Sequence, residues 1–146
     1  MTFAFWINLK VPFNFVRKDI EIPIVKDVYV VAVREYNEDF RTYDWNVYII
    51  NNGNDPLETV LIVSEGSDDT QTTSRMRHSL KLLPAKSYAK IEFLEDSVLP
   101  LNNYFTISYF IENKLFDKRY EFPAHCIIEE NAVTIPVMKT VGVLAR

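Results

Sequence analysis

The chain of 146 residues has the ordinary size of one domain and is long enough to bury a two-layer core. Hydrophobic residues make up 48% and charged residues 25% of it, a composition typical of folded globular proteins that excludes a disordered chain. The 20 acidic residues outnumber the 16 basic ones and leave a net charge of −4, so we expect no binding to nucleic acid, whose phosphates require uncompensated lysine and arginine.

Residues 1–18 differ from the rest of the chain, because they contain five aromatic residues, no acidic residue and no clean alternation. We interpret them as an N-terminal arm or, alternatively, as an extra strand ahead of a single domain over residues 19–146. The apolar residues 3–7 are followed at once by Asn8 and Lys10, which is too short a run for a signal peptide. No stretch approaches the roughly 18 apolar residues of a membrane span, so we expect no membrane association.

The chain from residue 19 onward is typical of short strands separated by turns. Residues 20–24 alternate between apolar and polar, and Pro23 confines them to a sheet edge or a strand start because proline cannot donate to a ladder. Residues 28–33 are continuously apolar, which predicts a strand covered on both faces.

A second strand is predicted over residues 44–51, where alternation places Trp45 on the core face. Residues 51–56 are rich in Asn, Gly and Asp, which tolerate the positive φ angles of turns. Because a further apolar strand follows at residues 59–64, we predict a hairpin over residues 44–64.

The clearest period-two stretch follows a polar loop at residues 64–73. One face carries apolar and histidine side chains, and the other carries small and basic ones. The first set, which starts at Ser74, is Ser74, Met76, His78, Leu80 and Leu82, and the second is Arg75, Arg77, Ser79 and Lys81. In the strand that follows, Ala89, Ile91 and Phe93 are predicted to point inward.

The last third of the chain predicts two more strands joined by a tight turn at Asn113 and Lys114. The first of them covers residues 104–112 and alternates clearly. Its core face is predicted to carry Phe105, Ile107, Tyr109 and Ile111. Residues 129–133 are compatible with one helical turn before a final strand.

These seven or eight strands, with hairpin turns and no crossover helices, predict an all-β fold. We expect an antiparallel immunoglobulin-like β-sandwich, with a small β-barrel as the alternative.

Two segments resemble parts of bacterial immunoglobulin-like and fibronectin-III-like adhesion modules. Residues 45–53 form a strand that ends on Asn-Gly. Residues 80–93 place Leu-Pro before a strand of alternating apolar residues, although Ala85 stands where those modules have glycine. The resemblance implies a β-sandwich.

Three other segments, residues 19–23, 45–51 and 114–118, are similar to short uncharacterised bacterial proteins, some of them labelled as phenylalanyl-tRNA synthetase α subunits. A synthetase core needs a glycine-rich, arginine-bearing platform for ATP. The chain has three isolated glycines, at positions 53, 66 and 142, so we do not expect synthetase activity or any phosphate-cradling loop.

Metal and nucleophile sites depend on few candidate residues. His78, His125 and Cys126 are the candidates for zinc, but neighbouring residues of a strand point to opposite faces, so His125 and Cys126 cannot share a metal there. Residues 65–69 lack the ligand alternation of a calcium loop. We therefore expect no metal, no cofactor and no enzymatic activity. A single cysteine allows no internal disulfide, which indicates a reducing, cytoplasmic environment.

Two groups of side chains could form binding surfaces. The first is the basic row Arg75, Arg77 and Lys81, which could meet an acidic partner or could guard an edge strand against unwanted pairing. The second is the aromatic set Tyr36, Phe40, Tyr43 and Trp45, which could stack on sugars, although Trp45 is in phase with core residues. We expect a non-catalytic protein-interaction module that binds another protein or a copy of itself, with a carbohydrate-binding module as the alternative.

Overall fold

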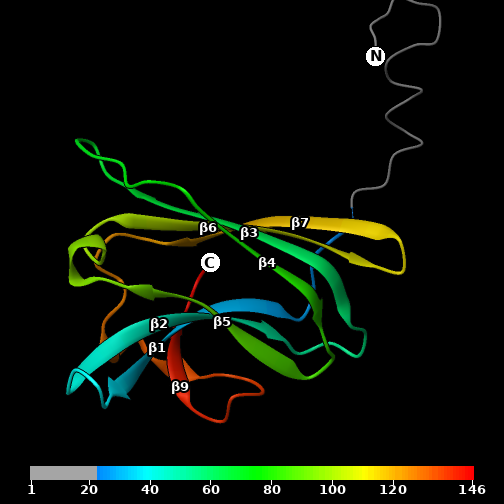
Figure 1. The fold of residues 1–146 in the computed structure, drawn as a ribbon, viewed down its shortest axis with the longest axis horizontal. Coiled ribbons are helices and arrows are strands. Elements are labelled where there is room, and N and C mark those ends of the chain that lie inside the picture. Colours follow the sequence, from blue (N-terminus) through cyan, green and yellow to red (C-terminus); the bar gives the residue numbers. More distant parts are fainter. Residues whose placement is uncertain (1–22) are drawn as a thin grey trace, which may run out of the picture.

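The computed structural model describes residues 23–146, which form two antiparallel β-sheets (Figure 1). The first sheet has the strand order β5-β2-β1-β9-β8 and the second has the order β4-β3-β6-β7. The nine strands are β1 (Val28–Asn37), β2 (Thr42–Asn51), β3 (Leu57–Ser67), β4 (Met76–Leu83), β5 (Ser87–Leu94), β6 (Asn102–Ile111), β7 (Lys114–Phe122), β8 (Val133–Thr134) and β9 (Val141–Leu144).

The two sheets lie one above the other in the view of Figure 1 and enclose the core between them. Strands β1, β2 and β5 face β4, β3, β6 and β7, which is the arrangement of an immunoglobulin-like sandwich. The predicted all-β sandwich is therefore confirmed. The barrel alternative is wrong, because each sheet ends in two edge strands and the sheets do not close on one another.

The core follows the predicted alternation closely. Trp45 is 9% exposed and packs between the sheets, which confirms its predicted place in the core. From the opposite sheet, Phe105, Ile107 and Tyr109 are each at most 1% exposed. Period-two alternation suffices here because each of these strands buries one face.

Strand β1 is covered on both faces, as its continuous apolar run predicted. Val30 and Ala32 belong to the main core, whereas Val31 and Val33 form a second buried cluster with Ile135. The chain reaches this outer face through the β8–β9 hairpin, and β9 pairs with β1. The helical turn predicted before the last strand is present as a 3₁₀ turn at Glu129–Asn131.

The predicted hairpin over residues 44–64 is wrong, because β2 and β3 lie in different sheets. β2 pairs with β1 and β5, while β3 pairs with β4 and β6. The connection is held by the buried Asn51, whose amide donates hydrogen bonds to the carbonyls of Asp55 (2.9 Å), Leu83 (3.2 Å) and Pro84 (3.0 Å). The same Asn and Gly residues that suit a hairpin turn here form an arch between the two layers.

The faces of β4 and β5 differ from prediction at one point each. The register of β5 against β2 shifts between Val47 and Tyr48, and the extra residue reverses the alternation beyond it. Leu94 therefore points into the core and Phe93 is 47% exposed, which corrects its predicted inward position. At the end of β4, Leu83 is buried and Leu82 is 52% exposed, although Leu82 was predicted to share the core face. The pairing of β4 with β3 has no shift there, whereas the pairing of β3 with β6 shifts between Glu58 and Leu61.

The predictions for residues 1–18, and most of that for residues 20–24, lie outside the described residues. Within the described part, Pro23 and Ile24 precede β1 and belong to no strand. No helix among the described residues is long and apolar enough to cross a membrane.

Candidate functional site

Strand β4 is a long, open edge of the described sheets. The two sheets end in the strands β5, β8, β4 and β7. β8 has two residues, β5 pairs through a bulge, and at the end of β7 (Lys114–Phe122) the backbone of Glu121 exchanges hydrogen bonds of 2.9 and 3.2 Å with Arg146. These are three of the ways in which proteins protect sheet edges. β4 has eight residues in unbroken register with β3, and among residues 23–146 no further strand pairs with its other side.

The three residues of the predicted basic row, Arg75, Arg77 and Lys81, have different surroundings in the structure. Arg75 lies one residue before β4, and its Nε is 3.4 Å from Oε1 of Glu65. Arg77 and Lys81 are exposed on the outer face of β4, with Ser79 between them. No carboxylate in the described part of the chain forms an ion pair with either of these two cations. Arg77 and Lys81 therefore remain as the two unneutralised charges of the row.

A cluster of three polar side chains, Ser64, His78 and Glu92, lies beneath β4 on its inner side. Alternation in the sequence did not predict this cluster. The bulge in β5 turns Glu92 inward, where its Oε1 accepts a hydrogen bond from the Ser64 hydroxyl at 2.6 Å and lies 2.9 Å from Nε2 of His78. The side chains of His78 and Glu92 are 26% and 12% exposed. The group joins the two sheets where their edge strands β4 and β5 approach each other.

The order in which Ser64, Glu92 and His78 contact one another does not suit nucleophilic catalysis. A serine nucleophile needs a base that accepts its proton, usually an imidazole oriented by a carboxylate. Here the carboxylate of Glu92 lies between Ser64 and His78, and the serine donates to it directly. The arrangement satisfies buried polar groups at a seam between sheets.

The metal candidates are not brought together. Within residues 23–146, no three His, Cys, Asp or Glu side chains gather as a metal site would require. Burial raises the pKa of the Cys126 thiol, which disfavours the thiolate that binds metals or attacks substrates. In the loop at residues 65–69, the Asp68 carboxylate accepts backbone hydrogen bonds from Thr70 (2.8 Å) and Gln71 (2.9 Å), which lower its pKa. That carboxylate caps a turn.

The four residues of the predicted aromatic surface do not all lie on one surface. Trp45 is in the core, so it cannot form a sugar platform. Tyr36 and Tyr43 face each other across β1 and β2, with ring centroids 5.1 Å apart, and the guanidinium of Arg34 lies 4.4 Å from the Tyr43 centroid. Phe40, at the tip of this hairpin, is 77% exposed.

Phe40 and the outward-turned Phe93 line one cavity of about 670 Å³ on the outer face of the first sheet. Its polar lining includes Glu35, whose Oε1 accepts hydrogen bonds from Nδ2 of Asn46 (2.8 Å) and the hydroxyl of Tyr48 (2.6 Å). Burial, followed by the hydrogen bond to Glu35, raises the pKa of Tyr48. The sequence did not point to Phe93 or Glu35 as members of a site. For Phe93 the reason is that no pattern in the sequence marks the bulge that turns it outward.

Comparison of the chain with protein-family models, with curated proteins and with solved structures gives no match.

Proposed function

We propose that this chain is a non-catalytic protein-interaction module that accepts an acidic, extended segment of another protein along β4. The proposal depends on one observation: β4 is an eight-residue edge strand in unbroken register with β3, without the bulge of β5, the shortness of β8 or the pairing with Arg146 at the end of β7. An added strand would bond to its free backbone groups, which is a common mode of peptide recognition.

The charge of β4 supports an acidic partner. Arg77 and Lys81 are exposed on one face and have no carboxylate partner among the described residues. Residues opposite each other on paired strands interact by about 0.2–1 kcal/mol, and opposite charges are favourable there. A partner with acidic residues at alternate positions would place them against both cations.

A second copy of the chain fits this edge less well. In an antiparallel pair of two β4 strands centred on Ser79, Arg77 of one copy lies opposite Lys81 of the other. Moving the centre to Leu80 leaves cations diagonal to one another across the pair. Because like charges at these positions are destabilising, charge complementarity favours a different, acidic chain over self-association.

The test is a selection of short random peptides displayed on phage against the full chain. We expect enrichment of sequences with acidic residues at alternate positions. The variant Arg77→Glu with Lys81→Glu should instead enrich basic residues at those positions. The control variant Arg41→Glu with Lys139→Glu makes the same change in net charge away from β4 and should select as the parent chain does. Unchanged selection by the β4 variant would refute the proposal.

Carbohydrate recognition is a second candidate, favoured by the cavity that Phe40 and Phe93 line. Sugars bind through stacking on aromatic faces together with hydrogen bonds to amide and carboxylate groups, and the cavity offers both kinds of group. Titration with a panel of soluble oligosaccharides, followed by NMR, tests it. Shifts near Phe93 that disappear in Phe93→Ala would support it, and the absence of any shift would rule it out.

A further inference from the structure

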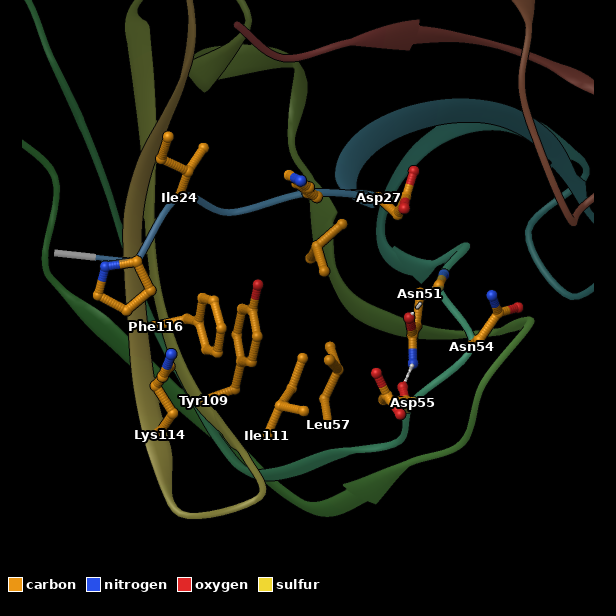
Figure 2. Close-up of a pocket in the computed structure, with 14 residues that line it drawn as sticks. Ile24, Asp27, Asn51, Asn54, Asp55, Leu57, Tyr109, Ile111, Lys114 and Phe116 are labelled. Atoms are coloured by element: carbon orange, nitrogen blue, oxygen red, sulfur yellow. Dashed lines mark hydrogen bonds between the residues drawn. The ribbon is translucent and has the colours of Figure 1, made fainter. Parts of the chain in front are cut away.

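A second cavity, of about 700 Å³, opens at one end of the sandwich (Figure 2). Three parts of the chain line it: residues 23–28, the β2–β3 connection and the β6–β7 hairpin. Its volume lies within the range of roughly 300–1,000 Å³ that is usual for small-molecule sites. Neither β4 nor the cavity beside Phe93 contributes to it, so this cavity is a separate candidate site.

The cavity has an apolar floor. The rings of Tyr109 and Phe116 stack with centroids 5.3 Å apart and planes 7° from parallel. Leu57 and Ile111 lie beside them in Figure 2. A flat or aliphatic group placed here would lose its contact with water against a surface that is already formed.

The hydroxyl of Tyr109 has an unusual environment for a buried tyrosine. Two tyrosines of the described chain, Tyr109 and Tyr120, are buried, and Tyr48 is partly buried. The hydroxyl of Tyr48 donates to Glu35, and that of Tyr120 donates to the carbonyl of Val28 at 2.6 Å. Tyr109 is 1% exposed, and its hydroxyl forms no hydrogen bond with any described residue.

Buried tyrosine hydroxyls usually have a partner, so an exception requires an explanation. In Figure 2 the Tyr109 hydroxyl points away from the β6–β7 hairpin, toward the side of the cavity where Ile24 lies. Burial raises the pKa of Tyr109 to about 12, so at neutral pH the hydroxyl keeps its proton and is a hydrogen-bond donor. It therefore calls for an acceptor that enters the cavity.

The charges at the cavity indicate what kind of acceptor fits. Lys26 and Lys114 line it, and within residues 23–146 neither forms an ion pair. The carboxylates of Asp27 and Asp55 line it as well. Lys114 lies next to Phe116 in Figure 2, whereas Asp27, Asp55 and Asn54 lie on the opposite side. The side of the cavity that carries the stacked rings is thus the positively charged one.

From these contacts we propose that the end cavity binds a small organic carboxylate with an apolar body. The body lies on the Tyr109–Phe116 rings, and a carboxylate oxygen accepts the hydrogen bond of the Tyr109 hydroxyl. Lys114 provides the positive charge on that side of the cavity. Charge-assisted hydrogen bonds of this kind are stronger than neutral ones, which favours a carboxylate over an alcohol or an amide.

The experiment is an NMR titration of the full, isotope-labelled chain with phenylpropanoate and decanoate, and with the amide of each acid as a neutral analogue of the same shape. We expect shifts at the backbone amides of residues 26–28, 51–57 and 109–116, and tighter binding of the acids than of their amides. Tyr109→Phe should weaken acid binding about tenfold, as expected for the loss of one charge-assisted hydrogen bond. Lys114→Gln should weaken the acids and leave the amides unchanged.

The matched control is Tyr104→Phe, which removes a hydroxyl from the opposite face of β6 and should leave binding unchanged. Thermal melting of Tyr109→Phe without ligand adds a second readout. Because the hydroxyl has no partner among residues 23–146, its removal should keep or raise the melting temperature. A clear fall would mean that the hydroxyl is bonded within the protein, and would overturn the proposal. Equal affinity for acids and amides, or no shift at the cavity, would also overturn it.

Discussion

The hydrogen bonds of Glu92 allow a quantitative test of the β5 bulge. Glu92 accepts from the Ser64 hydroxyl at 2.6 Å, and Ser64 is 4% exposed. Removing the carboxylate in Glu92→Ala leaves that buried hydroxyl without its acceptor. A hydrogen bond to a charged group contributes about 1.5–3 kcal/mol, and the contact with His78 adds a smaller amount because His78 is more exposed. We expect Glu92→Ala to lower the free energy of unfolding by about 2–4 kcal/mol.

A double-mutant cycle separates this pair from other effects of the substitution. Ser64→Ala alone should cost about 1–3 kcal/mol, because it leaves the carboxylate with one partner fewer. The double variant should cost less than the sum of the two single changes, with a coupling energy of about 1–3 kcal/mol. Urea unfolding measures all four free energies, provided that the slope of the transition is unchanged.

The control for this cycle is Glu95→Ala, since Glu95 is an exposed carboxylate three residues away and its removal should cost less than about 0.5 kcal/mol. Additive losses for Ser64 and Glu92 would refute the reasoning. They would mean that Glu92 points to solvent, as unbroken alternation along β5 would place it relative to Ile91.

Four further outcomes follow from the packing. Trp45→Ala should lower the free energy of unfolding by about 3–5 kcal/mol in urea, since it removes a large buried ring; an unchanged value would mean that the ring is exposed. Asn51→Ala should cost about 2–4 kcal/mol, because one buried amide bonds three carbonyls of the arch. Gly142→Ala should cost about 1–3 kcal/mol by calorimetry, since a Cβ there would lie 2.6 Å from a side-chain carbon of Val31. Arg77→Glu should shift the melting temperature by less than about 2 °C, because its charge is exposed and has no carboxylate partner within residues 23–146.

Alternation in the sequence was enough to predict the strands and most of their faces. Trp45 in β2 and Phe105, Ile107 and Tyr109 in β6 were all assigned to the core correctly. β6 buries one face, and β2 buries the face of Trp45 although Ile50 on its other face is also buried, so alternation records the core face in both strands. The continuous apolar run of β1 likewise predicted its second cover, although not that residues more than a hundred positions later supply it.

Pairing between strands was beyond the sequence alone. Asn51 and the residues after it suit both a hairpin and an arch between sheets, and the arch is held by the carbonyls of Leu83 and Pro84, more than thirty residues away. The same applies to the bulge that turns Phe93 outward and Glu92 inward, because one extra residue in β5 has meaning only against the register of β2.

The candidate sites depended on tertiary structure even more strongly. The sequence marked Arg77 and Lys81 as charged, but only the strand order makes β4 an edge. Tyr109 reads as an ordinary core residue in the sequence. Its hydroxyl becomes a candidate ligand contact because three separate parts of the chain meet around it and none of their described residues forms a hydrogen bond with it. A strand's faces are a local property that its own residues encode, whereas an edge, a bulge or an unsatisfied buried donor is defined by what distant residues do or do not place beside it.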